Sequence, residues 1–384
     1  ILAASPESSR SDISAQPVEE WSRLFKRTSG WTGADGAYSI SLSGKDVYRR
    51  TPGTRTLFLF GDTFIGEVTP GGKRQSGTTM INNTMAILEG LSPNSDRIDF
   101  YWRAGGEDEK PAAALLPEAQ GADGKRWYWP MDGAVLDGTF YLFASRMKRR
   151  QKTDTDGAFN FALDGVALLS TDVEQVTDFD SYRRREAPLY SPAAEGEGDI
   201  VFGGAVMVNT EQAGAPDPDG FVYVYGLRNQ PMNKRLLVAR VRAEDMADFA
   251  QWRFWDGEGW SRSLDAAAPL ADRLSSGFSV SPLPDGRYAC VFQIDGIGAH
   301  VAVRFGESPV GPFGPIHKVY RCPEADEDAG TFCYNAKAHP HLSRPGELLI
   351  SYNVNAFDFW DHFKNPDIYR PRFIRVRVGP GEGR

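Results

Sequence analysis

The sequence has few cysteines, no long apolar run and no excess of positive charge. Its 384 residues include three cysteines, which is too few for a disulfide-rich scaffold. The longest apolar runs, such as residues 57–60, are four to five residues long, whereas a membrane-spanning helix needs about 20. The net charge of −8 makes the phosphate backbone of a nucleic acid a poor partner. We therefore expect neither a membrane span nor a nucleic-acid partner.

The cysteines and residues 1–17 give information about the cellular compartment of the protein. Cys322 and Cys333 could form a disulfide in an oxidising environment, with Cys290 left as a buried thiol. Two reduced cysteines in surface loops fit the sequence equally well. Residues 1–17 are small, polar and rich in Ser and Ala, as expected downstream of a removed export signal, although a trimmed chain would look the same. These features favour a secreted or periplasmic protein.

Helix signals are scarce, whereas strand signals are plentiful. The best helix candidates, residues 17–25 and 243–249, are both short. β-Branched and aromatic runs bounded by Gly, Pro, Asp and Asn recur along the rest of the chain. The 40 glycines and 25 prolines fit the many turns that such a chain needs. The sequence therefore predicts an all-β fold.

One pattern recurs five times, namely a strand of small residues, a turn and an aromatic strand. The aromatic strands centre near residues 59, 142, 223, 290 and 350, so each interval of about 60 to 80 residues has room for a four-stranded sheet and a long loop. We predict a five-bladed β-propeller over residues 27–380. Residues 1–26 are predicted to form an N-terminal extension with a short helix. A pair of β-sandwiches is the alternative.

Polar residues stand where the first strands of the predicted blades begin. In a propeller these strands line the central channel and open at one mouth. The polar residues expected there are Asp35, Asp132, Asp199, Ser275, Ser276, Asn335, Lys337 and His339. Asp62 joins them from the end of the first aromatic strand. Several carboxylates in an aromatic-lined pocket suit glycoside hydrolysis, in which one carboxyl group protonates the leaving oxygen and another activates water or attacks the anomeric carbon.

Each candidate also has a structural interpretation. Asp35 and Asp132 each precede a glycine, and Asp-Gly is an ordinary turn dipeptide, so a structural role fits them equally well. A functional role is favoured for Asp62, because the Phe-Ile pair that follows the next threonine is unusual for a simple turn. His339 alternates with His341, so at most one of them faces the channel, and a hydrogen-bonded structural role is favoured over metal binding.

Two segments of the predicted first blade resemble a known family. Residues 33–37 (Gly-Ala-Asp-Gly-Ala) and residues 57–64 (Leu-Phe-Leu-Phe-Gly-Asp-Thr-Phe) resemble the first blade of a family of bacterial five-bladed propellers that includes endo-D-arabinanases. Residues 306–313 (Gly-Glu-Ser-Pro-Val-Gly-Pro-Phe) are similar to an outer-strand turn common among furanosidase propellers. By this resemblance, Asp35 and Asp62 would be the acid/base or nucleophile pair.

These features predict an exported glycoside hydrolase that cleaves a furanosyl linkage, D-arabinofuranosyl or fructofuranosyl, in an oligo- or polysaccharide. Asp35 and Asp62 would do the central chemistry, with Asp132 stabilising the oxocarbenium-like transition state or serving as the second carboxylate. The predicted substrate-binding residues are Trp31, Phe64, Asn83, Trp129, Asn335 and His339. No cofactor or metal is predicted, since no clear set of oxygen ligands presents itself for a Ca²⁺ on the axis.

Two other functions stay open at this point. A non-catalytic carbohydrate-binding propeller would use the same aromatic residues, and its carboxylates would only form hydrogen bonds. A propeller used as a protein interaction platform would have a flat top without a carboxylate-lined pocket.

Overall fold

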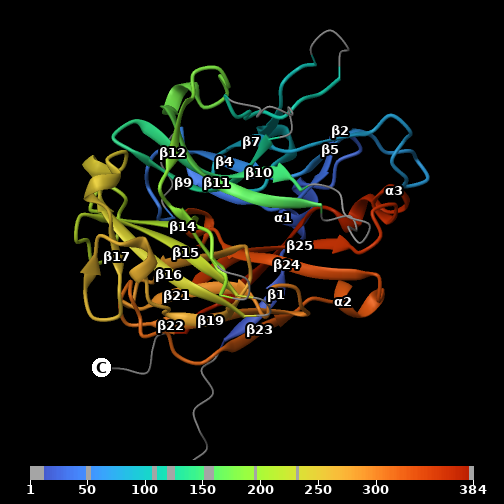
Figure 1. Cartoon of the computed structure of the whole chain (residues 1–384). Coiled ribbons are helices and arrows are strands. Elements are labelled where there is room, and N and C mark those ends of the chain that lie inside the picture. Colours follow the sequence, from blue (N-terminus) through green and yellow to red (C-terminus); the bar gives the residue numbers. More distant parts are fainter. Residues whose placement is uncertain are drawn as a thin grey trace, which may run out of the picture.

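The computed structural model describes residues 13–48, 53–105, 110–118, 126–150, 160–193, 197–230 and 233–379. In these residues the regular structure is almost entirely β-strand, which confirms the predicted all-β class (Figure 1). The α-helices there are short: α1 (Glu19–Leu24), α2 (Glu324–Glu327) and α3 (Asp361–Lys364). No helix of the described residues is long and apolar enough to cross a membrane.

Five sheets of four or more strands follow one another along the described chain. The first contains β3 (Tyr38–Ser41), β4 (Arg55–Phe60), β7 (Thr84–Glu89) and β8 (Ile98–Tyr101). The second contains β9 (Arg126–Leu136), β10 (Thr139–Arg149), β11 (Phe161–Asp172) and β12 (Arg183–Ala187). The third contains β13 (Tyr190–Ser191), β14 (Asp199–Asn209), β15 (Phe221–Gln230), β16 (Asn233–Arg242), β17 (Arg253–Trp255), β18 (Trp260–Ser261) and β19 (Ala271–Leu274).

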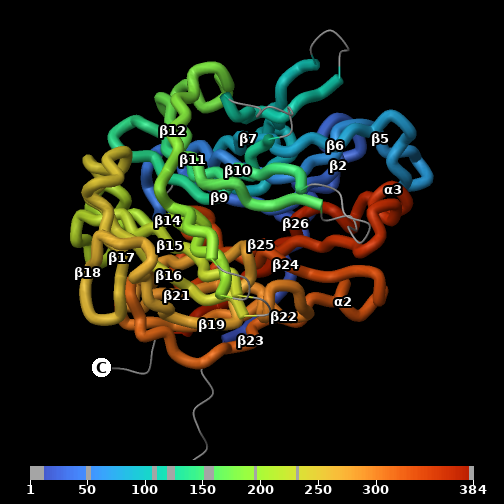
Figure 2. Tube along the Cα trace, in the orientation of Figure 1, coloured from blue at the N-terminus to red at the C-terminus, as the bar shows by residue number. Residues whose placement is uncertain are grey.

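The remaining sheets complete the arrangement, which can be followed along the colours of Figure 2. The fourth contains β20 (Phe278–Pro282), β21 (Tyr288–Gln293), β22 (His300–Gly306) and β23 (His317–Arg321). The fifth contains β24 (Thr331–Ala338), β25 (Glu347–Ala356), β26 (Pro371–Arg377) and β1 (Ser14–Pro17). A small sheet of β2 (Ser29–Ala34), β5 (Thr63–Glu67) and β6 (Thr79–Ile81) lies beside the first. All the strand pairs within these sheets of the described residues are antiparallel.

The first strand lies within the predicted N-terminal extension but belongs to the fifth sheet. β1 pairs with β26, where Ser14 lies opposite Arg377. α1 follows at once and packs Trp21 against Phe373 of β26, with ring centroids 5.6 Å apart. The short helix predicted within residues 17–25 is therefore present, and strands from near both ends of the chain meet in one sheet.

The prediction of a helix over residues 243–249 is wrong. Two separate 3₁₀ turns, Ala243–Asp245 and Phe249–Gln251, stand there instead. The carboxylate of Asp248 accepts the amide of Ala250 at 3.1 Å and so starts the second turn. A side chain that bonds the backbone in this way competes with a continuous helix.

One strand from each of the five large sheets lines a single narrow cavity of about 50 Å³, namely β3, β9, β14, β20 and β24. β9 packs beside β3 and β14, and β20 packs beside β14 and β24. Ser39 Oγ of β3 lies 2.6 Å from Nδ1 of His339, the residue that follows β24, and this hydrogen bond links the first and fifth sheets. A shared cavity of this kind is typical of a propeller, whereas two separate β-sandwiches would have none.

The aromatic strands of the repeated pattern lie in the middle of the sheets and form the core. Leu57 and Phe58 of β4 and Leu142 and Phe143 of β10 are fully buried. Residues of both faces pack between neighbouring sheets, as where Phe143 contacts Trp252, just before β17 of the third sheet, at a centroid distance of 6.0 Å. Burial on both faces explains why these strands are continuously apolar in the sequence.

The three cysteines are free and buried. Cys322 and Cys333 are neighbours, because the thiol of Cys322 is hydrogen-bonded to that of Cys333 and thereby helps to raise its pKa. The sequence left a disulfide and two reduced surface cysteines open, and the structure shows a reduced pair inside the fold.

Candidate active site

Two of the predicted catalytic residues, Asp35 and Asp62, are brought together by their backbones. Asp35 follows the last residue of β2, and Asp62 lies between β4 and β5. The Asp35 amide donates to the Asp62 carbonyl at 2.9 Å, and the Gly61 amide donates to the Asp35 carbonyl at 2.8 Å. A Cβ at Gly33, just before this contact, would lie 2.2 Å from the carbonyl oxygen of Tyr369. Glycine therefore lets the chain pass close to Tyr369 on its way to Asp35.

The Asp35 carboxyl group is surrounded by hydrogen-bond donors. Asn335 Nδ2 donates to Asp35 Oδ1 at 3.0 Å, and the hydroxyl group of Tyr334 and the amide of Gly36 also donate to this carboxyl group. Burial raises the pKa of Asp35, while these donors and the charge of Lys337 lower it. Burial outweighs these contributions, so the pKa of Asp35 is raised overall, although the donors and Lys337 offset part of the cost of its charge.

The Asp62 carboxyl group has fewer donors. Trp129 Nε1 donates to Asp62 Oδ1 at 2.9 Å, and Asn82 Nδ2 donates to the same oxygen at 3.2 Å. Burial raises the pKa of Asp62 to about 6, and the charge of Asp35 contributes in the same direction. A carboxyl group of this kind keeps its proton close to neutral pH.

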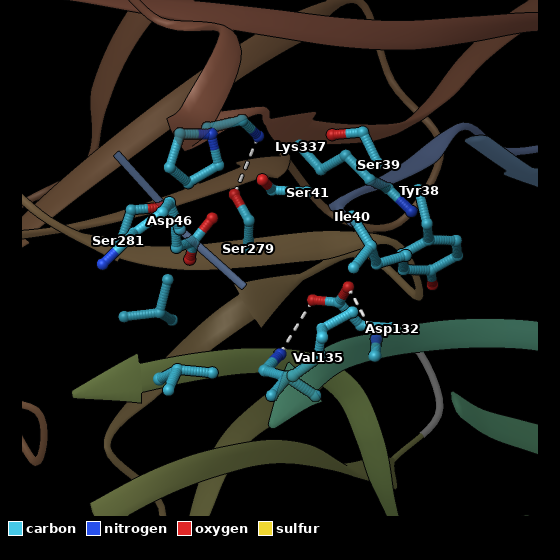
Figure 3. A pocket seen from close by; sticks show the side chains of 18 of the residues that line it. Tyr38, Ser39, Ile40, Ser41, Asp46, Asp132, Val135, Ser279, Ser281 and Lys337 are labelled. Carbon is cyan, nitrogen blue, oxygen red and sulfur yellow. Dashed lines mark hydrogen bonds between the residues drawn. The ribbon is translucent and has the colours of Figure 1, made fainter. Parts of the chain in front are cut away.

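Asp132, the third predicted catalytic residue, lies in the central cavity and not in the pair (Figure 3). Its Oδ1 accepts the amide of Gly133 at 2.9 Å, and its Oδ2 accepts the amide of Val206 on β14 at 2.8 Å. Burial raises the pKa of Asp132 to about 7 against these two bonds. By linking β9 to β14, Asp132 joins the second sheet to the third.

Lys337 is the residue of this site to which the sequence assigned no role. Its side chain is 3% exposed, and Nζ has no hydrogen-bond partner in the part of the chain that the structure describes. Nζ lies 3.0 Å from the ring centre of Tyr38. Burial lowers the pKa of Lys337 to about 7, although the charges of Asp132 and Asp35 raise it. The sequence analysis placed Lys337 among the polar residues at the mouth of the channel, but its burial and its missing hydrogen-bond partner depend on the fold.

Two of the predicted substrate-binding residues reach the carboxylate pair. Trp129 bonds Asp62, and Asn335 bonds Asp35, as described above. Asn335 has a φ of 57°, a left-handed conformation that asparagine tolerates better than most residues. Both side chains are only partly buried, so both have surface to offer to a ligand.

Trp31, Asn83 and His339, by contrast, are buried and already bonded. Trp31 Nε1 donates to Thr84 Oγ1 at 3.2 Å, and its ring packs in the core. The Asn83 amide donates to the carbonyl groups of Leu115 and Tyr128, both at 3.0 Å. His339 bonds serine hydroxyl groups through both ring nitrogens. These three side chains therefore have almost no exposed surface to offer to a ligand.

Phe64 is also buried, so it offers no surface for a sugar. The Arg74 guanidinium lies over its ring, 4.3 Å from the ring centre. Arg74 donates to the carbonyl group of Thr32 at 2.7 Å and to that of His362. Phe64 and Arg74 thus hold β2 and β5 against the segment that carries α3.

Comparison with known sequences and structures identifies the family of this chain and proteins with a similar fold. A model of the family described as a domain of unknown function, DUF5005, matches residues 19–378. The chain belongs to this family. The crystal structure of a Bacteroides ovatus protein described as a "putative hydrolase" is similar to this DUF5005 chain, with a TM-score of 0.71 and 21% identity over 97% of this chain and 93% of the other. At that identity the similarity shows the fold alone.

Two further relatives of the DUF5005 chain are more distant. The α-L-arabinofuranosidase PaAbf62A of Podospora anserina has a TM-score of 0.45 and 12% identity, over 91% of this chain and 98% of the other. Notoamide biosynthesis cluster protein J of Aspergillus sp. is 29% identical over 134 residues, which are 34% of this chain and 34% of the relative. The match therefore spans about a third of that curated protein.

An aromatic arm extends from Asp62 of the DUF5005 chain along the second sheet. Trp129 contacts Trp127 and Phe161, with ring centroids 6.1 Å and 4.8 Å away. All three side chains are partly exposed, and Trp127 and Trp129 alternate with Tyr128 and so share one face of β9. Exposed aromatic faces beside a carboxylic acid are suited to sugar rings.

The described residues of the DUF5005 chain contain no group of three or more His, Cys, Asp and Glu side chains that could hold a metal ion.

Proposed function

We propose that this protein is a glycoside hydrolase that acts on a furanosyl-containing glycan. The observation that carries the proposal is the Asp35–Asp62 pair, in which two partly buried carboxyl groups with raised pKa values are tied together through their backbones. Paired carboxyl groups of different acidity are what glycoside hydrolysis requires. The furanosyl class is supported by the resemblance of the segments around both aspartates to furanosidase propellers.

The environments of the two aspartates suggest different roles. Asp62, with a pKa of about 6, would protonate the leaving oxygen. Asp35, with three donors and the charge of Lys337 to stabilise its anion, would attack the anomeric carbon or activate the water that does so. The negative charge of Asp35 raises the pKa of Asp62, so the ionised partner keeps the acid protonated.

We also propose that the five large sheets are the blades of a five-bladed propeller closed by β1. The shared cavity, the contacts between successive first strands and the pairing of β1 with β26 support this. In such a propeller, Asp132 and Lys337 lie on the axis behind the reacting pair, where their charges would influence it without touching substrate.

Activity is expected to fall as the pH rises through about 6. Asp62 must carry a proton to act as the acid, and the pKa of about 6 sets the pH at which that proton is lost. The measurement is kcat/KM against pH for the wild-type protein, after screening D-arabinan, L-arabinan and inulin for released sugar. An Asp256→Asn variant, altered at an exposed turn, should give the same pH profile. If the protein binds one of these three glycans but cleaves none of them, it is instead a carbohydrate-binding protein.

Replacing Trp129 by phenylalanine is expected to raise the pH at which activity is lost on the alkaline side of the profile. The indole N–H lowers the pKa of Asp62, so its loss leaves the proton more tightly held. The shift should be roughly 0.5–1 pH unit, as expected when a carboxylate loses one hydrogen bond worth about 1 kcal/mol. The pH profile of kcat/KM measures it, and a Trp127→Phe variant, whose indole does not bond Asp62, is the matched control. A shift to lower pH would contradict the assigned role of Asp62.

A further inference from the structure

Large apolar side chains on the surface of the described residues are concentrated beside the carboxylate pair. Four of them are exposed, and three of these, Phe357, Phe359 and Trp360, lie in the loop between β25 and α3. Phe357 is 56% exposed and Trp360 is 64% exposed. The fourth, Ile297, pairs with Tyr334, the residue that bonds Asp35. Grouped exposed apolar side chains of this kind mark interaction sites.

A chain of contacts leads from these rings to Asp35. Tyr334, whose hydroxyl group donates to Asp35, contacts the ring of Phe332 at a centroid distance of 5.4 Å. Phe332 in turn contacts Phe357 at 4.8 Å. We call Phe332, Phe357, Phe359 and Trp360 the aromatic ledge. The aromatic ledge therefore begins two side chains away from the candidate nucleophile or base.

Packing contacts and a hydrogen bond hold the rings of the aromatic ledge in place. Phe359 packs on Phe64 with centroids 6.0 Å apart, and Arg74 covers the ring of Phe64. Trp360 contacts Phe363 of α3 at 5.6 Å, and its amide donates to the Asp358 carboxylate at 2.9 Å. α3 lies next to β5 at the edge of the molecule, which Figure 1 shows on the right. Rings fixed in this way lose little conformational freedom when a ligand binds.

A second set of hydrogen bonds ties the aromatic ledge to the same tyrosine. Asn355 Nδ2 donates to the hydroxyl group of Tyr334 at 3.0 Å. The Oδ1 atom of Asn355 lies 2.8 Å from Nε2 of His362, whose ring contacts Phe359 at 5.8 Å. The rings and the carboxylate pair thus belong to one connected, rigid surface.

We propose that the aromatic ledge is a glycan-binding subsite, which holds sugar units of the same chain whose scissile bond lies at Asp35 and Asp62. This inference rests on the proposed function. Aromatic faces stack on the C–H faces of sugar rings, and the carboxylates of Asp358 and Asp361 at the rim are acceptors for sugar hydroxyl groups. Continuity with the carboxylate pair favours substrate over an unrelated protein partner.

The test compares long and short substrates in ledge variants of the full chain. Trp360→Ala and Phe357→Ala should each lower kcat/KM on a polymeric furanosyl glycan by about 3- to 10-fold, as expected for the loss of one ring contact. The same variants should hydrolyse 4-nitrophenyl arabinofuranoside, which is too short to reach the aromatic ledge, within twofold of the wild-type rate. Trp360→Phe should restore most of the loss, and Lys318→Ala on β23 is the control for an exposed, non-aromatic change.

A binding measurement separates this inference from the proposed function. Affinity electrophoresis in gels containing D-arabinan, L-arabinan or inulin should retard an Asp62→Asn variant more strongly than the same variant with Trp360→Ala. This difference supports the aromatic ledge even if the wild-type protein cleaves none of the glycans, in which case the proposed hydrolase function fails alone. Equal retardation of both, or none of either, overturns the aromatic ledge. Cleavage of a polymer at the wild-type rate by the double Phe357→Ala, Trp360→Ala variant overturns it while the hydrolase function stands.

Discussion

Replacing Asp62 by asparagine is expected to lower kcat/KM on a furanosyl glycan by roughly 10²–10⁴-fold, the usual contribution of a positioned general acid. Asparagine can still accept the bonds from Trp129 and Asn82 on its amide oxygen, so the local geometry is preserved. It cannot donate a proton to a leaving oxygen. The measurement is the initial rate of sugar release at pH 5–6, with Asp256→Asn as the control for an exposed aspartate.

Substrates with different leaving groups test which of the two aspartates is the general acid. A 4-nitrophenyl furanoside has a good leaving group that needs little protonation, so the Asp62→Asn variant should keep much more of its activity on this substrate than on a glycan. An Asp35→Asn variant should be equally impaired on both, because either substrate needs the nucleophile or base. The opposite pattern would exchange the roles assigned to Asp35 and Asp62.

The Asp62→Asn substitution is also expected to stabilise the folded protein at neutral pH. Folded Asp62 holds its proton up to about pH 6, whereas an ordinary aspartate releases it near 3.8. The folded state thus binds more protons between these values, and the stability of the wild-type protein falls as the pH rises through this range. The Asp62→Asn variant has no such loss, so its free energy of unfolding at pH 7 should exceed that of the wild type by about 1–2 kcal/mol. Thermal unfolding at pH 4 and pH 7 measures the difference.

The parts of the site that the sequence could predict are those encoded locally. Asp35 and Asp62 stand in short motifs at the ends of strands, and strand ends meet at predictable places in a sheet protein. The fully buried strands β4 and β10 carry their burial in continuous apolar runs. In both cases a few neighbouring residues contain the whole signal, so no long-range contact is needed to read it.

The parts that the sequence could not predict depend on long-range packing. Phe64 is near Asp62 in the sequence, but Arg74 and the α3 segment bury it from the other side. Trp31 likewise turns into the core. The exposed rings of Phe357 and Trp360 lie in a loop without any motif, and only the fold brings them to Tyr334. Nearness in sequence therefore could not tell which aromatic residues are available to a sugar.

Lys337 is the other residue whose role only the fold reveals, and replacing it by methionine is the second change with a large expected effect. Below pH 7 the Lys337 ammonium group is charged and lowers the pKa of both Asp35 and Asp132. Without it, both carboxyl groups hold their protons to higher pH. A protonated Asp35 deprives the pair of the ionised partner that hydrolysis needs.

The expected result for Lys337→Met is a rise in the acid limit of the pH profile, with kcat/KM at pH 5 falling roughly 10-fold for each pH unit of that rise. Unfolding separates this electrostatic role from a structural one. Folded Lys337 has a pKa of about 7 against 10.5 for an ordinary lysine, so the unfolded wild-type chain binds more protons between these values and wild-type stability rises with pH there. The variant should lose that rise and be at least as stable as the wild type at pH 6, because a buried ammonium group without a hydrogen-bond partner among the described residues has been removed. Lys318→Met, at an exposed position of β23, should change neither measurement. A variant that unfolds more easily at pH 6 and keeps the wild-type pH profile would show that Lys337 only fills space.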